Sequence, residues 1–229
     1  MGWAGVDDFA AMTLRPLGEA WIPLLLRAAD RWRADTGLDG PDPDSLSKIA
    51  PLLDRVATWT ARVDLTAARD AESLVELYLL DALPLSAFLS PDTTSVVDVG
   101  SGGGAPGLTL ALLRPAIHVT LVEPRAKRVA FLRTSATELD CANVEVRRAR
   151  SEELPPNAYQ DAMSRATFAP EQWLGEGARI ASRGVWVFLA AAEPPERPGF
   201  RVEHDVEYVL PFSGAPRRAV GFIRDDATR

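Results

Sequence analysis

The first third of the chain has apolar residues at the spacing of α-helices. Over Leu46–Trp59 the apolar positions lie three or four residues apart, which predicts an amphipathic helix capped by Asp44 or Ser45. A second helix with the same spacing is predicted over Ala71–Leu89. The segment 1–36 is also predicted to be helical. The chain therefore begins with a helical part.

Short runs rich in β-branched residues alternate with helical segments further along the chain. The predicted strands are Ser95–Val99, Ile117–Val122, Val144–Val146, Ala162–Met163, Val185–Ala190, Val202–Tyr208 and Arg218–Ile223. The predicted helices between them are Leu108–Arg114, Arg125–Leu139 and Ala169–Ala181. This alternation is typical of a parallel sheet with right-handed crossovers, and the last two strands have no helix between them. We expect an α/β protein with a helical N-terminal extension (1–93) and a domain (94–229) whose mostly parallel seven-stranded sheet has an antiparallel last strand.

Composition and charge narrow the class of protein. With 229 residues, of which 47% are hydrophobic, the chain can bury a substantial core. Its 25 Lys and Arg residues against 32 Asp and Glu residues give a net charge of −7, which argues mildly against a general nucleic-acid binder. Residues 1–93 hold 8 basic and 15 acidic residues, whereas residues 114–150 hold 8 basic and 4 acidic ones. The basic stretch is either a solvated helix face or a surface for phosphate groups.

The sequence favours a reducing compartment and no membrane span. Because Cys141 is the one cysteine, no disulfide can form within the chain, which suits the cytosol. We expect no signal peptide, since the first residues lack a basic region followed by an apolar run, and Trp21–Leu26 is too short to cross a bilayer. His118 and His204 have no partner at metal-ligand spacing. We expect a cytoplasmic monomer that enters no membrane and holds no metal.

A glycine-rich loop between a predicted strand and a predicted helix has the clearest chemistry. Residues 100–107 are Gly-Ser-Gly-Gly-Gly-Ala-Pro-Gly. Glycine lets a ligand approach the main chain, and the following helix offers free N–H groups. In an open α/β sheet, ligands bind at the carboxyl ends of the strands, where this loop lies. Gly100, Gly102 and Ala105 match the dinucleotide fingerprint G-x-G-x-x-G/A, which on its own does not decide the ligand.

Two carboxylates favour S-adenosylmethionine over a dinucleotide. Asp98 lies two residues before the first glycine, where it can face the cationic methionine end of that cofactor but would be unhelpful beside a pyrophosphate. Glu123 ends the next predicted strand and can accept both ribose hydroxyls, a feature shared with NAD enzymes. The pattern predicts a Rossmann-like methyltransferase that depends on S-adenosylmethionine. A nicotinamide oxidoreductase and a turn without a ligand are the alternatives.

Further motifs occur in a fixed order around this loop. They are Trp-Thr-Ala-Arg-Val-Asp-Leu-Thr-Ala-Ala-Arg-Asp at 59–70, Leu-Leu-Asp-Ala-Leu at 79–83, Leu-Val-Glu-Pro-Arg-Ala-Lys-Arg-Val-Ala-Phe-Leu-Arg at 121–133, Arg-Ser-Glu-Glu at 150–153 and Ser-Arg-Ala at 164–166. Together with the loop, this set resembles the RsmG (GidB) family of bacterial methyltransferases, which modify guanine N7 in small-subunit ribosomal RNA. The resemblance runs from about Leu46 to about Arg165.

The resemblance implies a role for the matching positions. The cofactor-binding residues would be Asp98, Gly100, Gly102, Ala105, Glu123, Ser151, Glu152 and Arg165. Among these, Glu123 would hold the ribose, while Ser151 and Glu152 would flank the adenine. Arg165 would lie near the cofactor or the target base, which makes it the candidate catalytic residue. RNA phosphates would be contacted by Arg125, Lys127 and Arg128.

The chain also departs from the family pattern. Tyr78 stands where the family usually has His, Asp64 replaces an Asn, and Ala105 replaces an aromatic residue or leucine. The family's Leu-Lys-Gly after the late strand is absent, and Phe188–Ala191 stands there instead. The leading expectation is methyl transfer to guanine N7 of small-subunit ribosomal RNA, free or within the 30S subunit. A related methyltransferase with another RNA or a small molecule as substrate, and a cofactor-binding module without catalysis, stay open.

Overall fold

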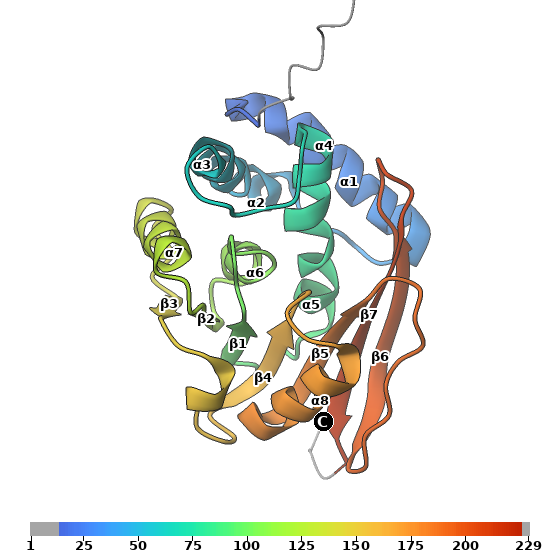
Figure 1. Cartoon of the computed structure of the whole chain (residues 1–229). Coiled ribbons are helices and arrows are strands. Elements are labelled where there is room, and N and C mark those ends of the chain that lie inside the picture. Colours follow the sequence, from blue (N-terminus) through green and yellow to red (C-terminus); the bar gives the residue numbers. More distant parts are fainter. Residues whose placement is uncertain (1–13, 226–229) are drawn as a thin grey trace, which may run out of the picture.

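A seven-stranded sheet forms the centre of the molecule, with the strand order β3-β2-β1-β4-β5-β7-β6 (Figure 1). The computed structural model describes residues 14–225. The strands are β1 Ser95–Val99, β2 His118–Val122, β3 Val144–Arg147, β4 Tyr159–Ser164, β5 Ala181–Leu189, β6 Phe200–Val209 and β7 Pro216–Arg224. β7 is antiparallel to its neighbours β5 and β6, and the other neighbouring pairs are parallel. The predicted sheet, mostly parallel with an antiparallel last strand, is confirmed.

Helices cover both faces of the sheet. They are α1 Trp21–Thr36, α2 Pro43–Ser47, α3 Ala50–Thr60, α4 Ala71–Val75, α5 Ala82–Phe88, α6 Gly107–Leu113, α7 Ala126–Glu138 and α8 Pro170–Ile180. Short helical turns add η1 Gly18–Ala20, the π-helical η2 Glu76–Leu80 and η3 Ser151–Glu153. Helix α1 lies within the segment predicted helical over 1–36, of which residues 1–13 lie outside the described part.

The N-terminal helices are more broken than their spacing predicted. The helix predicted over Leu46–Trp59 is wrong as a single element, because α2 ends at Ser47 and α3 begins three residues later with Pro51 in its first turn. The predicted cap is also wrong, since the Asp42 side chain accepts the N–H of Ser45 at 2.8 Å. The helix predicted over Ala71–Leu89 is divided by η2.

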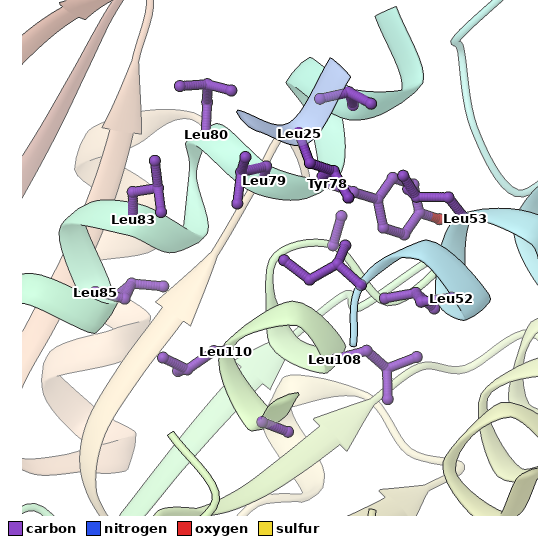
Figure 2. Packing of buried hydrophobic residues seen from close by; sticks show 14 of the residues in the cluster. Leu25, Leu52, Leu53, Tyr78, Leu79, Leu80, Leu83, Leu85, Leu108 and Leu110 are labelled. Carbon is purple, nitrogen blue, oxygen red and sulfur yellow. The ribbon is translucent and has the colours of Figure 1, made fainter. Parts of the chain in front are cut away.

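Apolar side chains form a core on each face of the sheet. The larger core joins the N-terminal helices, α6 and α7 to one face, and Figure 2 shows leucines of α3, α5 and α6 that belong to this core together with Tyr78. The second core packs Trp173 and Leu174 of α8 against Val185 and Val187 of β5 on the other face. Because the helices and the sheet share the larger core, the division between residues 93 and 94 stays a prediction.

The β6–β7 hairpin closes the sheet next to α1 (Figure 1). Trp32 of α1 meets Tyr208 of β6 edge to face, with the ring centroids 5.3 Å apart. Within residues 14–225, no helix is both long and apolar enough to cross a membrane.

The glycine loop lies at the carboxyl edge of the sheet. This edge lies between the N-terminal helices and the loops that follow β2, β3 and β4.

Candidate functional site

The glycine loop follows β1 directly and is hydrogen-bonded to the end of β2. The N–H groups of Gly100 and Ser101 donate to the Val122 carbonyl at 2.8 and 3.1 Å. Gly100 has a φ of +76°, and a Cβ there would collide with the Thr167 side chain. A residue without a side chain is required at this left-handed position, because the segment after β4 lies against it. The predicted strand–loop–helix arrangement is present.

Tyr78 supports the loop from the side of the N-terminal helices. Its hydroxyl donates to the Gly103 carbonyl at 2.7 Å, its side chain is buried, and its ring lies beside Leu53 of α3 (Figure 2). A Cβ at Gly103 would come within 2.5 Å of that hydroxyl and 2.7 Å of the Leu65 carbonyl. Burial raises the pKa of Tyr78, so the hydroxyl keeps its proton and stays a donor. The tyrosine that replaces the family's histidine therefore holds the loop in place.

The Tyr78→Phe variant is expected to lose about 1 to 3 kcal/mol of unfolding free energy, because the buried Gly103 carbonyl loses its donor. Denaturant unfolding followed by circular dichroism measures this change. Tyr159→Phe, in the second core, is the matched control and should lose less. Equal losses for the two variants would contradict a specific contribution of the Tyr78 hydroxyl.

Asp98 is fully buried at the end of β1. Its Oδ2 accepts the N–H of Gly107 at 3.2 Å, while its Oδ1 has no hydrogen-bond partner among residues 14–225. Burial raises the pKa of Asp98 to about 7, and the charge of Arg165 opposes this rise. The carboxyl group thus keeps one free acceptor next to the loop.

The raised pKa of Asp98 predicts a pH dependence of stability. The ordinary pKa of this group is 3.8, whereas in the folded protein it is about 7. Between these values the folded state binds more protons than the unfolded state, so the stability contributed by Asp98 falls as pH rises. As pH rises across this window, the unfolding free energy of Asp98→Asn should fall less than that of the wild type. Parallel profiles for the two proteins would contradict the raised pKa.

Glu123 lies at the mouth of the loop, directly after β2. Its carboxylate oxygens accept the N–H groups of Gly102 at 3.0 Å and of Arg125 at 2.8 Å, and 3% of the residue is exposed. These two contacts fix the side chain between the glycine loop and the start of α7. Each carboxylate oxygen has a further lone pair, so Glu123 can also accept hydroxyl groups of a ligand.

A cavity of about 190 Å³ opens beside the loop at the carboxyl ends of β1 and β2. It is lined by Val99, Gly100, Val122, Pro124, Ala149, Arg150, Ser151, Glu152, Thr167 and Phe168. Apolar walls with a few polar groups suit a flat purine ring. Ser151 and Glu152 thus line the same cavity as Gly100, and their contact with the adenine stays a prediction. Ala105 lies in the larger core instead.

Arg165 follows β4 at the same edge of the sheet. Its Nη1 lies 3.6 Å from Asp81 Oδ2, while its Nε is buried without a hydrogen-bond partner in the described part of the chain. Asp98 Oδ1 and Arg165 Nε are therefore a free buried acceptor and a free buried donor, and such groups are usually satisfied in folded proteins. The amino-acid part of a ligand carries both matching groups. Its ammonium group can donate to Asp98 Oδ1, and its carboxylate can accept from Arg165 Nε. The residues present fit S-adenosylmethionine.

The three residues predicted to contact RNA differ in their surroundings. Arg125 and Lys127 are exposed near the start of α7, and their side chains have no ion pair or hydrogen bond with any residue from 14 to 225. Arg128 is engaged, since its Nε donates to the Asp64 carbonyl at 2.8 Å and its Nη2 lies 3.2 Å from Asp64 Oδ2. Arg128 therefore connects α7 to the N-terminal segment.

Two residues beside the site gave no recognisable pattern in the sequence. Thr167 packs against Gly100, and Tyr208 donates its hydroxyl proton to Asp81 Oδ1 at 2.6 Å. Neither residue belongs to a motif. The two contacts follow from the packing of distant segments, which local spacing does not indicate.

Solved methyltransferase structures have the same fold. A SAM dependent methyltransferase from Aquifex aeolicus aligns with a TM-score of 0.50 and 20% identity, covering 66% of this chain and 93% of that chain. The mitomycin 7-O-methyltransferase MmcR aligns with a TM-score of 0.50 and 14% identity, covering 80% of this chain and 58% of that chain. Fold and site together define a Rossmann-like methyltransferase whose cofactor is S-adenosylmethionine.

Within this class, the family model described as rRNA small subunit methyltransferase G (GidB) matches residues 45–196, and the chain belongs to this family. The Ribosomal RNA small subunit methyltransferase G of Halorhodospira halophila is 37% identical over 164 residues, covering 68% of this chain and 77% of that protein. The protein of the same name from Neisseria gonorrhoeae is 32% identical over 180 residues, covering 77% of this chain and 86% of its own length. The predicted family, enzyme class and cofactor are confirmed, and the oxidoreductase alternative is not supported.

Proposed function

We propose that this protein transfers a methyl group from S-adenosylmethionine to guanine N7 of small-subunit ribosomal RNA. The relatives described above carry names that specify small-subunit ribosomal RNA. The observation that carries the proposal is the gathering of Asp98, Glu123 and Arg165 around the glycine loop at one edge of the sheet. A cytoplasmic, monomeric enzyme is part of the same proposal.

The proposed cofactor contacts follow from the free groups at this edge. Glu123 accepts the ribose hydroxyls, and Ser151 and Glu152 flank the adenine in the cavity beside Gly100. Asp98 Oδ1 accepts from the methionine ammonium group, whereas Arg165 donates to the methionine carboxylate. Support comes from Asp98 Oδ1 and Arg165 Nε, which are buried without partners in the described part of the chain, and from the cavity size. Because 26% of the Arg165 side chain is exposed, its guanidinium can face the target base as well.

In this reaction the protein has to position the base and the cofactor and to balance charge. When bound, the cofactor supplies an electrophilic methyl group on a sulfonium centre. Guanine N7 carries a lone pair and no proton, so no residue has to act as a general base. The protein accelerates transfer by holding the base in line with the methyl group. Methylation leaves a positive charge on the base, and the buried Asp81 carboxylate beside Arg165 offsets positive charge at this edge.

Three cations lie on the lining of the cavity or in the segment that follows β2. Arg125 and Lys127 are exposed after β2, and Arg150 lies on the lining of the cavity. Of the carboxylates nearby, Glu123 binds backbone N–H groups and Asp64 pairs with Arg128, whereas Glu152 is exposed on the lining of the cavity. Phosphate groups of RNA are the proposed partners of the three cations, which makes binding sensitive to salt. The net charge of −7 does not oppose this local arrangement, because salt screens exposed charges beyond about 10 Å.

Methyl-labelled cofactor incubated with undermethylated 30S subunits, and separately with naked RNA, tests the proposal. Label is expected in the RNA, and the yield is expected to fall as salt rises. A double variant, Arg125→Ser with Lys127→Ser, should transfer less and show a weaker salt dependence. If the protein binds the cofactor while neither substrate takes up label, the RNA assignment is contradicted. That outcome would favour a small-molecule acceptor or a binding module.

A further inference from the structure

A hydrogen bond and an ion pair, both made by the buried Asp81 carboxylate, connect the β6–β7 hairpin with Arg165. The Tyr208 hydroxyl donates to Asp81 Oδ1 at 2.6 Å, and Asp81 Oδ2 lies 3.6 Å from Arg165 Nη1. Tyr208 is 3% exposed and Asp81 is 5% exposed, so water competes little for these contacts. Tyr208 and Asp81 are 127 residues apart in the sequence. The hairpin is therefore linked to the proposed active site by the Asp81 carboxylate.

Tyr208 is held in place as a donor. Burial and the Asp81 carboxylate raise the pKa of Tyr208 well above its ordinary value, so the hydroxyl keeps its proton. The ring is fixed by its edge-to-face contact with Trp32, at a centroid distance of 5.3 Å. Because the Tyr208 ring is fixed, its hydroxyl has one position. That position determines where Asp81 Oδ1 can lie.

The same hairpin also binds the other end of the π-helical turn η2. Glu76 Oε1 accepts the N–H groups of Phe212 and Ser213 at 2.7 and 2.8 Å. Glu76 is the first residue of η2, and Asp81 follows its last residue. Turns of this kind are frequent at functional sites. The hairpin thus anchors both ends of a turn whose middle residue, Tyr78, supports the glycine loop.

We propose that Tyr208 is a positioning residue for methyl transfer, whose hydroxyl fixes Asp81 so that Asp81 fixes the Arg165 guanidinium at the cofactor edge. This inference rests on the role proposed above for Arg165. Tyr208 lies outside residues 45–196, the part of the chain that matches the family model. Without the hydroxyl, Asp81 Oδ1 becomes a buried acceptor with no partner, and the carboxylate turns and takes the guanidinium with it.

A double-variant cycle with Tyr208→Phe and Arg165→Ala in the full chain tests the inference. Tyr208→Phe keeps the ring on Trp32 and is expected to lower kcat about tenfold, because a small displacement of a positioning group is costly. In the Arg165→Ala background the same change should leave kcat unaltered, since the group that Tyr208 positions is absent. Tyr159→Phe, in the second core, is the matched control and should leave kcat unchanged.

Equal losses of kcat in both backgrounds would overturn the inference, because Tyr208 would then act without Arg165. The unfolding free energies of the same four proteins give a readout that needs no methyl acceptor. Non-additive effects are expected because both residues contact Asp81, and additive effects would overturn the inference. If the wild type labels no RNA, the result contradicts the proposed function alone. The unfolding free energies still show whether Tyr208 and Arg165 are coupled. If Tyr208→Phe does not fold, Asp81→Asn replaces it in the same cycle.

Discussion

Replacing Arg165 with alanine is expected to lower kcat/KM for methyl transfer about 100-fold, the size of effect seen when one preorganised donor is removed from an active site. The Arg165 Nε is buried without a partner, and its guanidinium lies beside Asp81 and raises the charged fraction of Asp98. The variant therefore loses a donor to the ligands and removes the cation that acts on both buried carboxyl groups, Asp81 and Asp98. Initial rates at saturating cofactor measure the change.

Arg133→Ala is the matched control for this prediction, because Arg133 lies on α7 and, among residues 14–225, its side chain donates to the Val146 carbonyl alone, at 3.3 Å. Its rate should stay near that of the wild type. Arg165→Lys should recover little activity, since an ammonium group cannot reproduce the planar donor set of a guanidinium. A rate for Arg165→Ala within threefold of the wild type would contradict a role of Arg165 in transfer.

The Glu123→Ala variant is expected to weaken S-adenosylmethionine binding more than about tenfold, because hydrogen bonds to a charged group contribute roughly 1.5 to 3 kcal/mol. Glu123 binds the N–H groups of Gly102 and Arg125, so its removal also releases the mouth of the glycine loop. Calorimetry with the cofactor measures the dissociation constant, and circular dichroism checks that the variant is folded.

Glu123→Gln separates the two contributions, since the amide keeps one acceptor and loses the charge. Its affinity should fall between those of the wild type and Glu123→Ala. Glu171→Ala, at an exposed position in the first turn of α8, serves as the control and should bind as the wild type does. An unchanged dissociation constant for Glu123→Ala would show that Glu123 is not the ribose ligand.

The sequence predicted the parts of the molecule that local patterns determine. The β-branched run Ser95–Val99, the glycines after it and the helix that follows specify the strand–loop–helix unit, because each step depends on neighbouring residues. The position of Glu123 follows from the same periodicity one strand later. These local rules are sufficient for the strand–loop–helix unit and for Glu123, whereas Ser151, Glu152 and Arg165 were indicated by the family resemblance.

The parts that the sequence did not predict depend on packing between distant segments. The spacing over Ala71–Leu89 is that of one continuous helix, but the π-helical turn η2 interrupts it where Glu76 and Asp81 meet the β6–β7 hairpin. The basic residue Arg128 matched a phosphate-binding pattern, yet in the fold it pairs with Asp64 from the N-terminal segment. Neither outcome can be derived from a residue's near neighbours in the chain.

Two departures from the family pattern have different structural consequences. Tyr78 in place of histidine is accommodated, because its hydroxyl binds the Gly103 carbonyl from within the larger core. At the end of β5 the family's lysine has no equivalent, since Leu189 is buried and Ala190 and Ala191 follow it. The cations proposed to contact RNA, Arg125, Lys127 and Arg150, follow β2 and β3 instead.

The identity of the methylated nucleoside tests the proposed function most directly. RNA from undermethylated 30S subunits is treated with the protein and labelled S-adenosylmethionine, digested to nucleosides and separated by chromatography with mass spectrometry. We expect the label to elute as 7-methylguanosine, and the Arg165→Ala protein to yield far less of it. Label in a different nucleoside, or no label while calorimetry shows the cofactor bound, would contradict methyl transfer to guanine N7.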